Sequence, residues 1–181
     1  MVVITPFARV SAAVRRTEAV MKRVVLFFLV GCITTGCAPR GGSVEATNHE
    51  LVSAVFSDVW SKGNVELIPA LFSERYVGHF PGGDTVRGPE GLASAVMAHR
   101  RAFPDWTEEV EGVIIDHEWL AVRFTSRGTN LGDFLGNPPT GNHVEISEVA
   151  IFKLRDGRIV EQWVYPDILS LQRQLGKMEH E

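Results

Sequence analysis

The dipeptide Asp156-Gly157 separates two segments, residues 144–153 and 159–165, that both have the character of strands. A two-residue turn of this kind requires positive φ, which Gly adopts without strain, so the pattern favours a β-hairpin. Period-two alternation on the second strand places four residues on one face: Ile159, Glu161, Trp163 and Tyr165. Because this face mixes apolar, acidic and aromatic side chains, we interpret it as the wall of a pocket.

Helical patterns precede the strands. Thr47-x-x-Glu50 is a capping box, which predicts a helix from there to about Lys62. The elements expected after it are helices at residues 65–72 and 89–103, strands at 106–115 and 119–127, and a Gly- and Pro-rich loop at 128–142. Helices followed by a run of antiparallel strands predict an α+β fold, and not an alternating parallel sheet.

Residues 21–37 have the character of a targeting sequence. Met21-Lys22-Arg23 is a short basic segment, and the apolar residues 24–31 are too few to span a bilayer. Residues 33–37, Ile-Thr-Thr-Gly-Cys, resemble a bacterial lipoprotein cleavage box, which predicts acylation of Cys37. An ordinary signal peptide or membrane anchor is the alternative. We divide the chain into an upstream segment before the true start (1–20), a signal peptide (21–37), a tether (38–46) and one domain (47–178).

The charge of the chain limits its partners. Five of the 18 Lys and Arg residues and one of the 22 Asp and Glu residues precede Cys37, so the rest has a net charge of −8. Basic residues are not clustered, which argues against a nucleic-acid partner. Both cysteines, Cys32 and Cys37, belong to the leader, so the domain contains no disulfide. We expect a lipid-anchored protein on the periplasmic side of the bacterial outer membrane, whose only membrane contact is the anchor.

Polar residues in the strands are the first candidates for a site. Arg123 and Glu161 both lie in mid-strand, where a lone charge costs free energy unless it is paired. We therefore expect them to meet, with Trp163 beside them, either as a structural salt bridge or as part of a pocket. Asp167 is a candidate acid–base residue, and it is equally a good helix N-cap. His79 is another candidate.

Other kinds of chemistry lack a signature in the sequence. The histidines are scattered without the paired spacing of a zinc site, and His99 and Arg100 are expected on an exposed helix face. No Gly-rich phosphate loop opens a helix, and no Gly-x-Ser-x-Gly elbow is present. The remaining candidates are carboxylates, a His and an Arg around an aromatic pocket, which suits proton transfer without a cofactor.

Several short motifs follow one another in a distinctive order. They include Tyr76-Val77-Gly78-His79, Phe103-Pro104-Asp105, Gly132-x-Phe134-x-Gly136-x-Pro138-Pro139-Thr140-Gly141 and Asp156-Gly157-Arg158-Ile159-x-Glu161-x-Trp163-x-x-x-Asp167. This ordered set resembles the SnoaL-like polyketide cyclases, or ester cyclases, of the nuclear transport factor 2-like superfamily. The resemblance extends from about Leu51 to Gly176. It implies a strongly curved antiparallel sheet that helices wrap into a cone with an apolar cavity.

The resemblance also implies an activity. Members of that family close a ring in a polyketide ester by an intramolecular aldol reaction, with a late Asp as the acid–base residue. It assigns that role to Asp167, helped by His79, and substrate contacts to Arg123, Glu161, Trp163, Phe134 and Tyr76. It implies no cofactor, a small apolar carbonyl or ester compound as ligand, and a homodimer formed through the open face of the sheet.

One position departs from the family pattern. Members often have Gly-Thr-His where this chain has Gly128-Thr129-Asn130, and Asn130 cannot titrate in place of a His. Two hypotheses are therefore open. The protein is a cofactor-independent enzyme that performs ring closure, or a related hydrolysis or isomerisation, on a small apolar carbonyl compound. Alternatively, it is a non-catalytic lipoprotein that holds an apolar molecule in the same cavity, with residues 132–142 as a lid.

Overall fold

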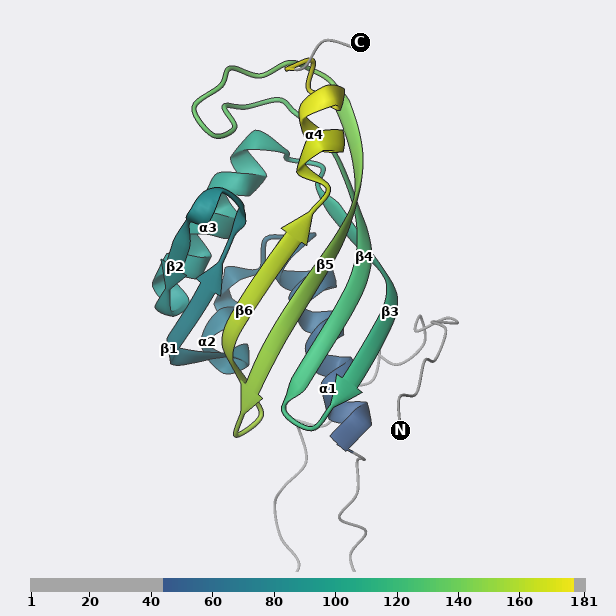
Figure 1. Cartoon of the computed structure of the whole chain (residues 1–181). Coiled ribbons are helices and arrows are strands. Elements are labelled where there is room, and N and C mark those ends of the chain that lie inside the picture. Colours follow the sequence, from purple (N-terminus) through teal and green to yellow (C-terminus); the bar gives the residue numbers. More distant parts are fainter. Residues whose placement is uncertain (1–43, 178–181) are drawn as a thin grey trace, which may run out of the picture.

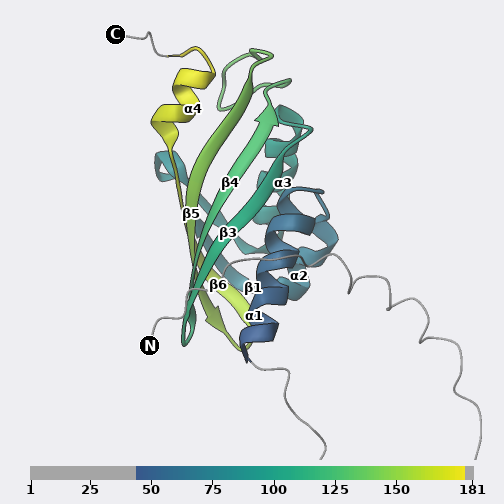
Figure 2. The ribbon, with the colours of Figure 1, turned by 90° about the vertical axis from the view of Figure 1, so that its right-hand side faces the viewer.

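The computed structural model describes residues 44–177 (Figure 1). One six-stranded sheet, in the order β2-β1-β6-β5-β4-β3, forms a curved layer, and α1, α2 and α3 cover one of its faces (Figure 2). The predicted upstream segment, the signal peptide with Cys37, and tether residues 38–43 lie outside the described residues. Within residues 44–177, no helix combines the length and apolar character that crossing a membrane requires.

The helical part begins earlier than the capping box predicts. Helix α1 (Val44–Ser53) starts three residues before Thr47, so this predicted helix start is wrong. It continues directly into a π-helix, η2 (Ala54–Trp60), which buries Val55, Phe56 and Val59. A 3₁₀ turn, η3 (Val65–Leu67), leads into α2 (Ile68–Leu71). Helix α3 (Gly88–Ala102) has Pro89 in its first turn, where a missing N–H costs nothing, and it confirms the third predicted helix.

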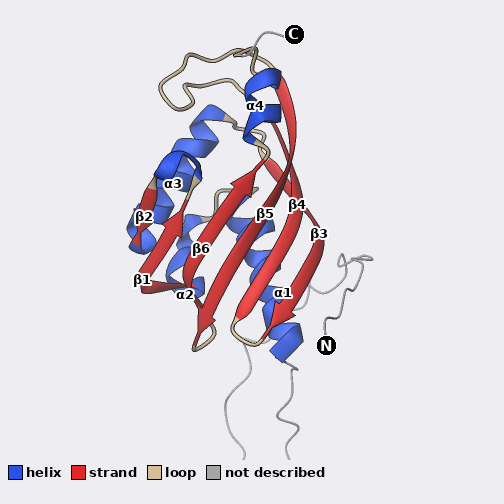
Figure 3. Cartoon of the chain, in the orientation of Figure 1, coloured by secondary structure: helices blue, strands red, loops and turns tan. Residues whose placement is uncertain are grey.

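The strands confirm the predicted α+β class (Figure 3). They are β1 (Phe72–His79), β2 (Thr85–Arg87), β3 (Thr107–Asp116), β4 (Trp119–Thr129), β5 (His143–Arg155) and β6 (Arg158–Pro166), followed by α4 (Ile168–Gln174). All neighbouring strands are antiparallel except β1 and β6, whose parallel pairing the sequence did not predict. The hairpin is confirmed, since φ is 52° at Asp156 and 73° at Gly157.

A register shift in β6 overturns the predicted pocket wall. Lys153 pairs with Glu161, whereas the next residue of β5, Leu154, pairs with Ile159. One extra residue therefore lies in β6, which is a β-bulge, and a bulge reverses the alternation of side chains beyond it. Ile159 and Gln162 are buried on the helix-covered face, so Glu161 and Trp163 point away from it.

The core has two parts that meet at the concave face of the sheet. In the larger part, the Phe56 ring contacts Phe124 and Phe152, with centroids 4.7 and 6.0 Å apart. The smaller part joins the end of α3 to α4 and includes Phe103 and Trp106. Gly128 permits this packing, because a Cβ there would lie 2.7 Å from the Trp106 ring. A cavity lies where the two parts meet, because residues of both line it.

Candidate functional site

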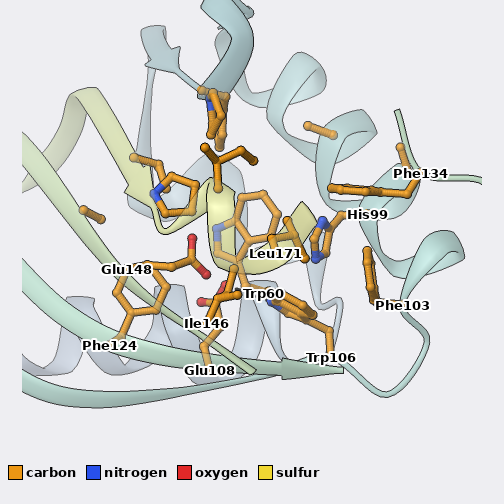
Figure 4. Close-up of a pocket in the computed structure, with 18 of the residues that line it drawn as sticks. Trp60, His99, Phe103, Trp106, Glu108, Phe124, Phe134, Ile146, Glu148 and Leu171 are labelled. Atoms are coloured by element: carbon orange, nitrogen blue, oxygen red, sulfur yellow. Dashed lines mark hydrogen bonds between the residues drawn. The ribbon is translucent and has the colours of Figure 1, made fainter. Parts of the chain in front are cut away.

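A cavity of about 280 Å³ lies between the concave face of the sheet and the helices (Figure 4). Seven aromatic rings, from the π-helix, β4, the β4–β5 loop and the segments that follow β1 and α3, form much of its wall: Phe56, Trp60, Phe80, Phe103, Trp106, Phe124 and Phe134. Val164, Ile168 and Leu171, from β6 and α4, add to this apolar surface. The predicted apolar cavity is thus present, and it suits a largely apolar, ring-containing ligand.

Two glutamates bring carboxyl groups into this apolar space (Figure 4). Glu108 lies on β3 opposite Ser126 of β4, and Glu148 lies on β5 opposite Phe124 of β4. These β4 residues are two positions apart and share a face, so the two carboxyl groups are neighbours across the strand. Glu148 is 8% exposed, and neither its Oε1 nor the buried Oε2 of Glu108 has a hydrogen-bond partner in residues 44–177.

The surroundings of these carboxyl groups favour their neutral forms. Burial raises the pKa of Glu148 to about 7, and the nearby Ser126 hydroxyl only partly offsets this. Burial also raises the pKa of Glu108 well above its usual range, and repulsion from Glu148 adds to the effect. The indole N–H of Trp106 donates a 3.1 Å hydrogen bond to Glu108 Oε1 and acts in the opposite direction. Both carboxyl groups therefore keep their protons to higher pH than an exposed Glu does, and Glu148 is partly ionised near neutral pH.

His99 also belongs to the cavity wall. Its ring stacks on Phe103 and contacts Trp106 edge to face, with centroids 5.2 and 4.4 Å apart. Burial lowers the pKa of His99 to about 4, and the charge of Arg100 adds to this, so the imidazole is neutral at pH 7. Its Nε2 is buried with no hydrogen-bond partner in the described part of the chain. The predicted exposed face for His99 is wrong, because α3 turns this residue toward the sheet.

Arg100 was expected on the same exposed face, and it too is partly buried. Its guanidinium donates to the backbone carbonyls of Trp60, Ser61, Trp106 and Pro104. These bonds hold the end of the π-helix against the turn that leads into β3. Arg100 therefore positions two walls of the cavity without lining it.

Two predicted substrate-binding residues lie at or near the cavity. Phe134 lines it, and its ring packs against Phe103 with centroids 5.0 Å apart. Tyr76 is fully buried behind the wall, and its hydroxyl donates a 2.8 Å hydrogen bond to Oε1 of Gln162, a residue that lines the cavity. Burial raises the Tyr76 pKa, which keeps this donor neutral. Substrate contact by either residue stays a prediction.

Three other predicted residues meet on the opposite, convex face of the sheet. His79 Nε2 lies 3.0 Å from Glu161 Oε1, and its ring stacks on Trp163 with centroids 5.2 Å apart. Trp163 in turn stacks on Trp119 at 5.8 Å. The structure thus brings His79, Glu161 and Trp163 together, but none of them lines the cavity.

The expected contact between Arg123 and Glu161 is wrong. Arg123 forms an ion pair with Glu111 of β3, with Nη2 2.7 Å from Oε2. Strand β5 separates β4 from β6, and on β5 the partner of Arg123 is Val149 whereas that of Glu161 is Lys153. The Arg123 side chain is 65% exposed, so water as well as Glu111 stabilises its charge.

Asp167 lies at the N-cap of α4. Its Oδ1 accepts a 2.9 Å hydrogen bond from the backbone N–H of Ser170, which confirms the capping alternative. The residue is exposed and does not line the cavity, although Pro166 and Ile168 on either side of it do. Its catalytic role stays a prediction that this arrangement does not favour.

Asn130, singled out in the sequence because it cannot titrate, has a structural role. It is 1% exposed, and its side-chain amide donates to the carbonyl of Gly132 at 2.8 Å. Its Oδ1 accepts from the backbone N–H of Thr140 at 2.9 Å. Asn130 therefore ties the two ends of the β4–β5 loop together and does not line the cavity.

Sequence reasoning missed Glu108, Glu148 and His99. For Glu148 a signal was available, because it interrupts an otherwise apolar period-two series formed by Val144, Ile146, Ala150 and Phe152. For Glu108 the alternating charges of β3 concealed which one faces inward. Across residues 44–177, no group of three or more His, Cys, Asp or Glu side chains is placed to hold a metal ion.

The comparisons with known proteins agree with this cavity-bearing fold. A family model described as SnoaL-like polyketide cyclase matches residues 50–175. The chain belongs to the SnoaL-like polyketide cyclase family. This membership confirms the resemblance stated from the motifs, and with it the expected cone of curved sheet and helices.

Curated relatives of this SnoaL-like chain share about half of it. It is 31% identical over 96 residues to the aklanonic acid methyl ester cyclase DnrD of Streptomyces peucetius. These residues make up 51% of this chain and 64% of that protein. It is 30% identical over 95 residues to the aklanonic acid methyl ester cyclase AcmA of Streptomyces galilaeus. Here the aligned residues make up 51% of this chain and 65% of that protein. The match thus spans less than two thirds of either relative.

Solved structures resemble the domain over most of their length. A SnoaL-like polyketide cyclase structure from Jannaschia sp. CCS1 superposes with a TM-score of 0.68 at 24% identity, over 74% of this chain and 94% of that one. IdmH from Streptomyces antibioticus, described as a polyketide cyclase, gives 0.62 at 29% identity, over 71% and 97%. The first of these likenesses establishes the shared fold alone.

Proposed function

We propose that this SnoaL-like protein catalyses cofactor-independent acid–base chemistry on a small, largely apolar carbonyl compound. The observation that supports it is the pair of buried carboxyl groups, Glu108 and Glu148, in an aromatic cavity. One buried oxygen of each, Glu108 Oε2 and Glu148 Oε1, has no hydrogen-bond partner in residues 44–177, which is costly unless a ligand or water satisfies it. Groups whose pKa values are displaced in one cleft are typical of active sites.

The two carboxyl groups are suited to different steps. Glu148, with a pKa of about 7, is partly ionised near neutral pH and removes a proton from the carbon next to a carbonyl. The electron pair moves onto the carbonyl oxygen. Glu108, kept protonated, donates a hydrogen bond to that oxygen as its negative charge develops. His99 is neutral and can hydrogen-bond a second polar group of the substrate.

The names of the relatives suggest a second step after proton removal. In an aldol ring closure, the carbon that lost its proton bonds to a second carbonyl carbon of the same molecule. The oxygen of that carbonyl then takes the proton that Glu148 removed. The sequence is an isomerisation that consumes no other reactant. We propose this ring closure, on an ester or ketone, as the specific reaction that the protein catalyses.

The proton-removal step can be tested before the natural substrate is known. The probe is 2-tetralone in D₂O, with deuterium exchange next to its carbonyl followed by NMR. Wild-type protein should accelerate the exchange, and Glu148→Gln should lose ~10²–10⁴-fold of that acceleration. Glu145→Gln makes the same chemical change on β5, on an exposed residue that pairs with Arg127, and should match wild type. Aklanonic acid methyl ester is the second probe, with the cyclised isomer as product.

Ligand binding without catalysis is the second candidate. The exposed position of Asp167 and the structural role of Asn130 favour it, since neither supplies acid–base chemistry to the cavity. Wild-type protein that binds 2-tetralone yet leaves its exchange rate at the solvent value would support this candidate and contradict the enzyme. Attachment through Cys37, a periplasmic location and a homodimer stay proposals that rest on the sequence.

A further inference from the structure

The charge of the cavity wall has one sign. Four carboxyl side chains line it: Asp84, Glu108, Asp133 and Glu148. Among the described residues, no lysine or arginine lines it. A carboxylate or phosphate on the ligand would meet repulsion here with no cationic partner. The wall therefore selects a ligand that is neutral or positively charged.

The four carboxyl groups differ in depth. Glu108 and Glu148 lie on the concave face of the sheet, where burial favours their neutral forms. Asp84 and Asp133 are exposed, so they lie at the opening. Strands β1 and β6 are parallel and β4 has the same direction, so Asp84 after β1 and Asp133 after β4 lie at one end of the sheet (Figure 1).

Backbone hydrogen bonds hold both segments at the opening. The N–H of Phe80 donates to the carbonyl of Asp84 at 2.9 Å and closes the turn around η4 (Pro81–Gly83). The N–H of Phe134, next to Asp133, donates to the carbonyl of Asn137 at 2.9 Å. Neither aspartate forms a salt bridge with the described part of the chain. Each aspartate therefore belongs to a segment that backbone hydrogen bonds hold in place, and its carboxylate is exposed.

Aromatic rings accompany these carboxylates. Phe80 and Phe134, close in sequence to Asp84 and Asp133, both line the cavity. A ring face attracts a cation, and a carboxylate beside it adds direct charge attraction. Deeper in the same cavity, the buried and unpartnered Oε1 of Glu148 independently indicates a polar ligand group. The cavity therefore offers a ligand polar groups both at its opening and at its deep end.

We propose that the ligand carries a basic nitrogen, protonated in solution, held at the opening by Asp84 and Asp133. Its carbonyl end reaches Glu108 and Glu148, and its apolar body lies among the rings. This inference deepens the proposed function by naming a substrate class, and it rests on the same cavity. No bond forms or breaks in this recognition.

Matched probes test the proposal: 2-naphthylmethylamine, 2-naphthylmethanol and 2-naphthoic acid, which share a ring system and differ in charge. Binding is measured by calorimetry and by quenching of Trp60 and Trp106, which line the cavity. The amine should bind about three- to tenfold more tightly than the alcohol, and the acid most weakly. In the double variant Asp84→Asn/Asp133→Asn, this advantage of the amine should disappear.

The control variant is Asp116→Asn/Asp156→Asn, which makes the same change in net charge at two exposed residues away from the cavity, one at the end of β3 and one in the β5–β6 turn. It should keep the full amine preference. Equal binding of amine and alcohol to wild type would overturn the proposal, and so would a preference that survives in Asp84→Asn/Asp133→Asn. The amine and alcohol probes have no carbonyl, so their result is independent of the exchange assay. Failure of catalysis and failure of cation recognition are therefore distinguishable.

Discussion

Two glutamates on strand β5 show how differently the two faces of the sheet solvate the same type of side chain. Glu145 faces outward, is exposed, and accepts a 2.7 Å hydrogen bond from Nε of Arg127. Glu148, three residues further along β5, faces the cavity, where burial raises its pKa to about 7. On the concave face Glu148 is buried and its Oε1 has no hydrogen-bond partner in residues 44–177, whereas on the convex face Glu145 has both water and an arginine partner. Solvation, and not residue type, therefore separates a candidate acid–base group from a surface charge.

The largest expected effect is the loss of activity when Glu148, and not Glu145, is substituted. We expect Glu148→Gln to lower exchange of the 2-tetralone probe by ~10²–10⁴-fold, because an amide cannot accept the proton. Glu108→Gln should also slow exchange, since an amide is a weaker hydrogen-bond donor to the developing oxyanion. Equal rates for Glu148→Gln and Glu145→Gln would contradict the assignment.

The next largest effect concerns stability as a function of pH. An unfolded Glu ionises near pH 4.3, whereas folded Glu148 keeps its proton up to about pH 7, so wild-type protein loses stability as pH rises through this window. Gln has no such loss. The stability of Glu148→Gln relative to wild type should therefore increase between pH 4 and 8, by at most about 3 kcal/mol. Urea denaturation at each pH measures this change, and a constant difference would contradict it.

Substitution of Asp167 should have a smaller effect, on stability alone. Asp167→Ala should cost about 1 kcal/mol, because the α4 N-cap is lost, whereas Asp167→Asn should cost little, because Asn also caps helices. We expect Asp167→Asn to retain exchange activity, since the residue lies outside the cavity. If this variant folds normally and is inactive, the role that the family resemblance assigns to Asp167 is correct.

The smallest effect is expected on the convex face. Glu161→Gln breaks the contact with His79, but both side chains are more than a third exposed, so solvent screens their interaction. The loss of stability should stay below about 1 kcal/mol, and raised salt should reduce it further. Thermal unfolding at two salt concentrations measures it. If Glu161→Gln lost several kcal/mol of stability, the convex face would not be solvated as proposed.

The sequence predicted much of the architecture, because its signals are local. The Asp156-Gly157 turn, the Pro89 helix start and the loop before β5 all depend on backbone preferences of a few residues. The parallel pairing of β1 with β6 was not predictable in this way, because it joins segments about 80 residues apart without a local signal.

The candidate site was predicted less well, and one residue explains much of the error. The extra residue in β6 reverses the alternation, so Glu161 and Trp163 were placed in the pocket and Gln162 and Val164 were not. Charge in mid-strand was also a poor guide. Arg123 is solvated, because it alternates with the buried residues of β4, whereas Glu148 is buried without a compensating cation, because it pairs with Phe124 on the inner face.

The central claim is that the cavity holds two carboxyl groups with displaced protonation. ¹³C NMR titration of the glutamate side-chain carboxyls tests it most directly, with Glu148→Gln and Glu108→Gln to assign the two signals. The account predicts that the Glu148 signal titrates near pH 7 and that Glu108 stays protonated to higher pH. Titration of both signals near pH 4.3, where an unperturbed Glu ionises, would contradict it.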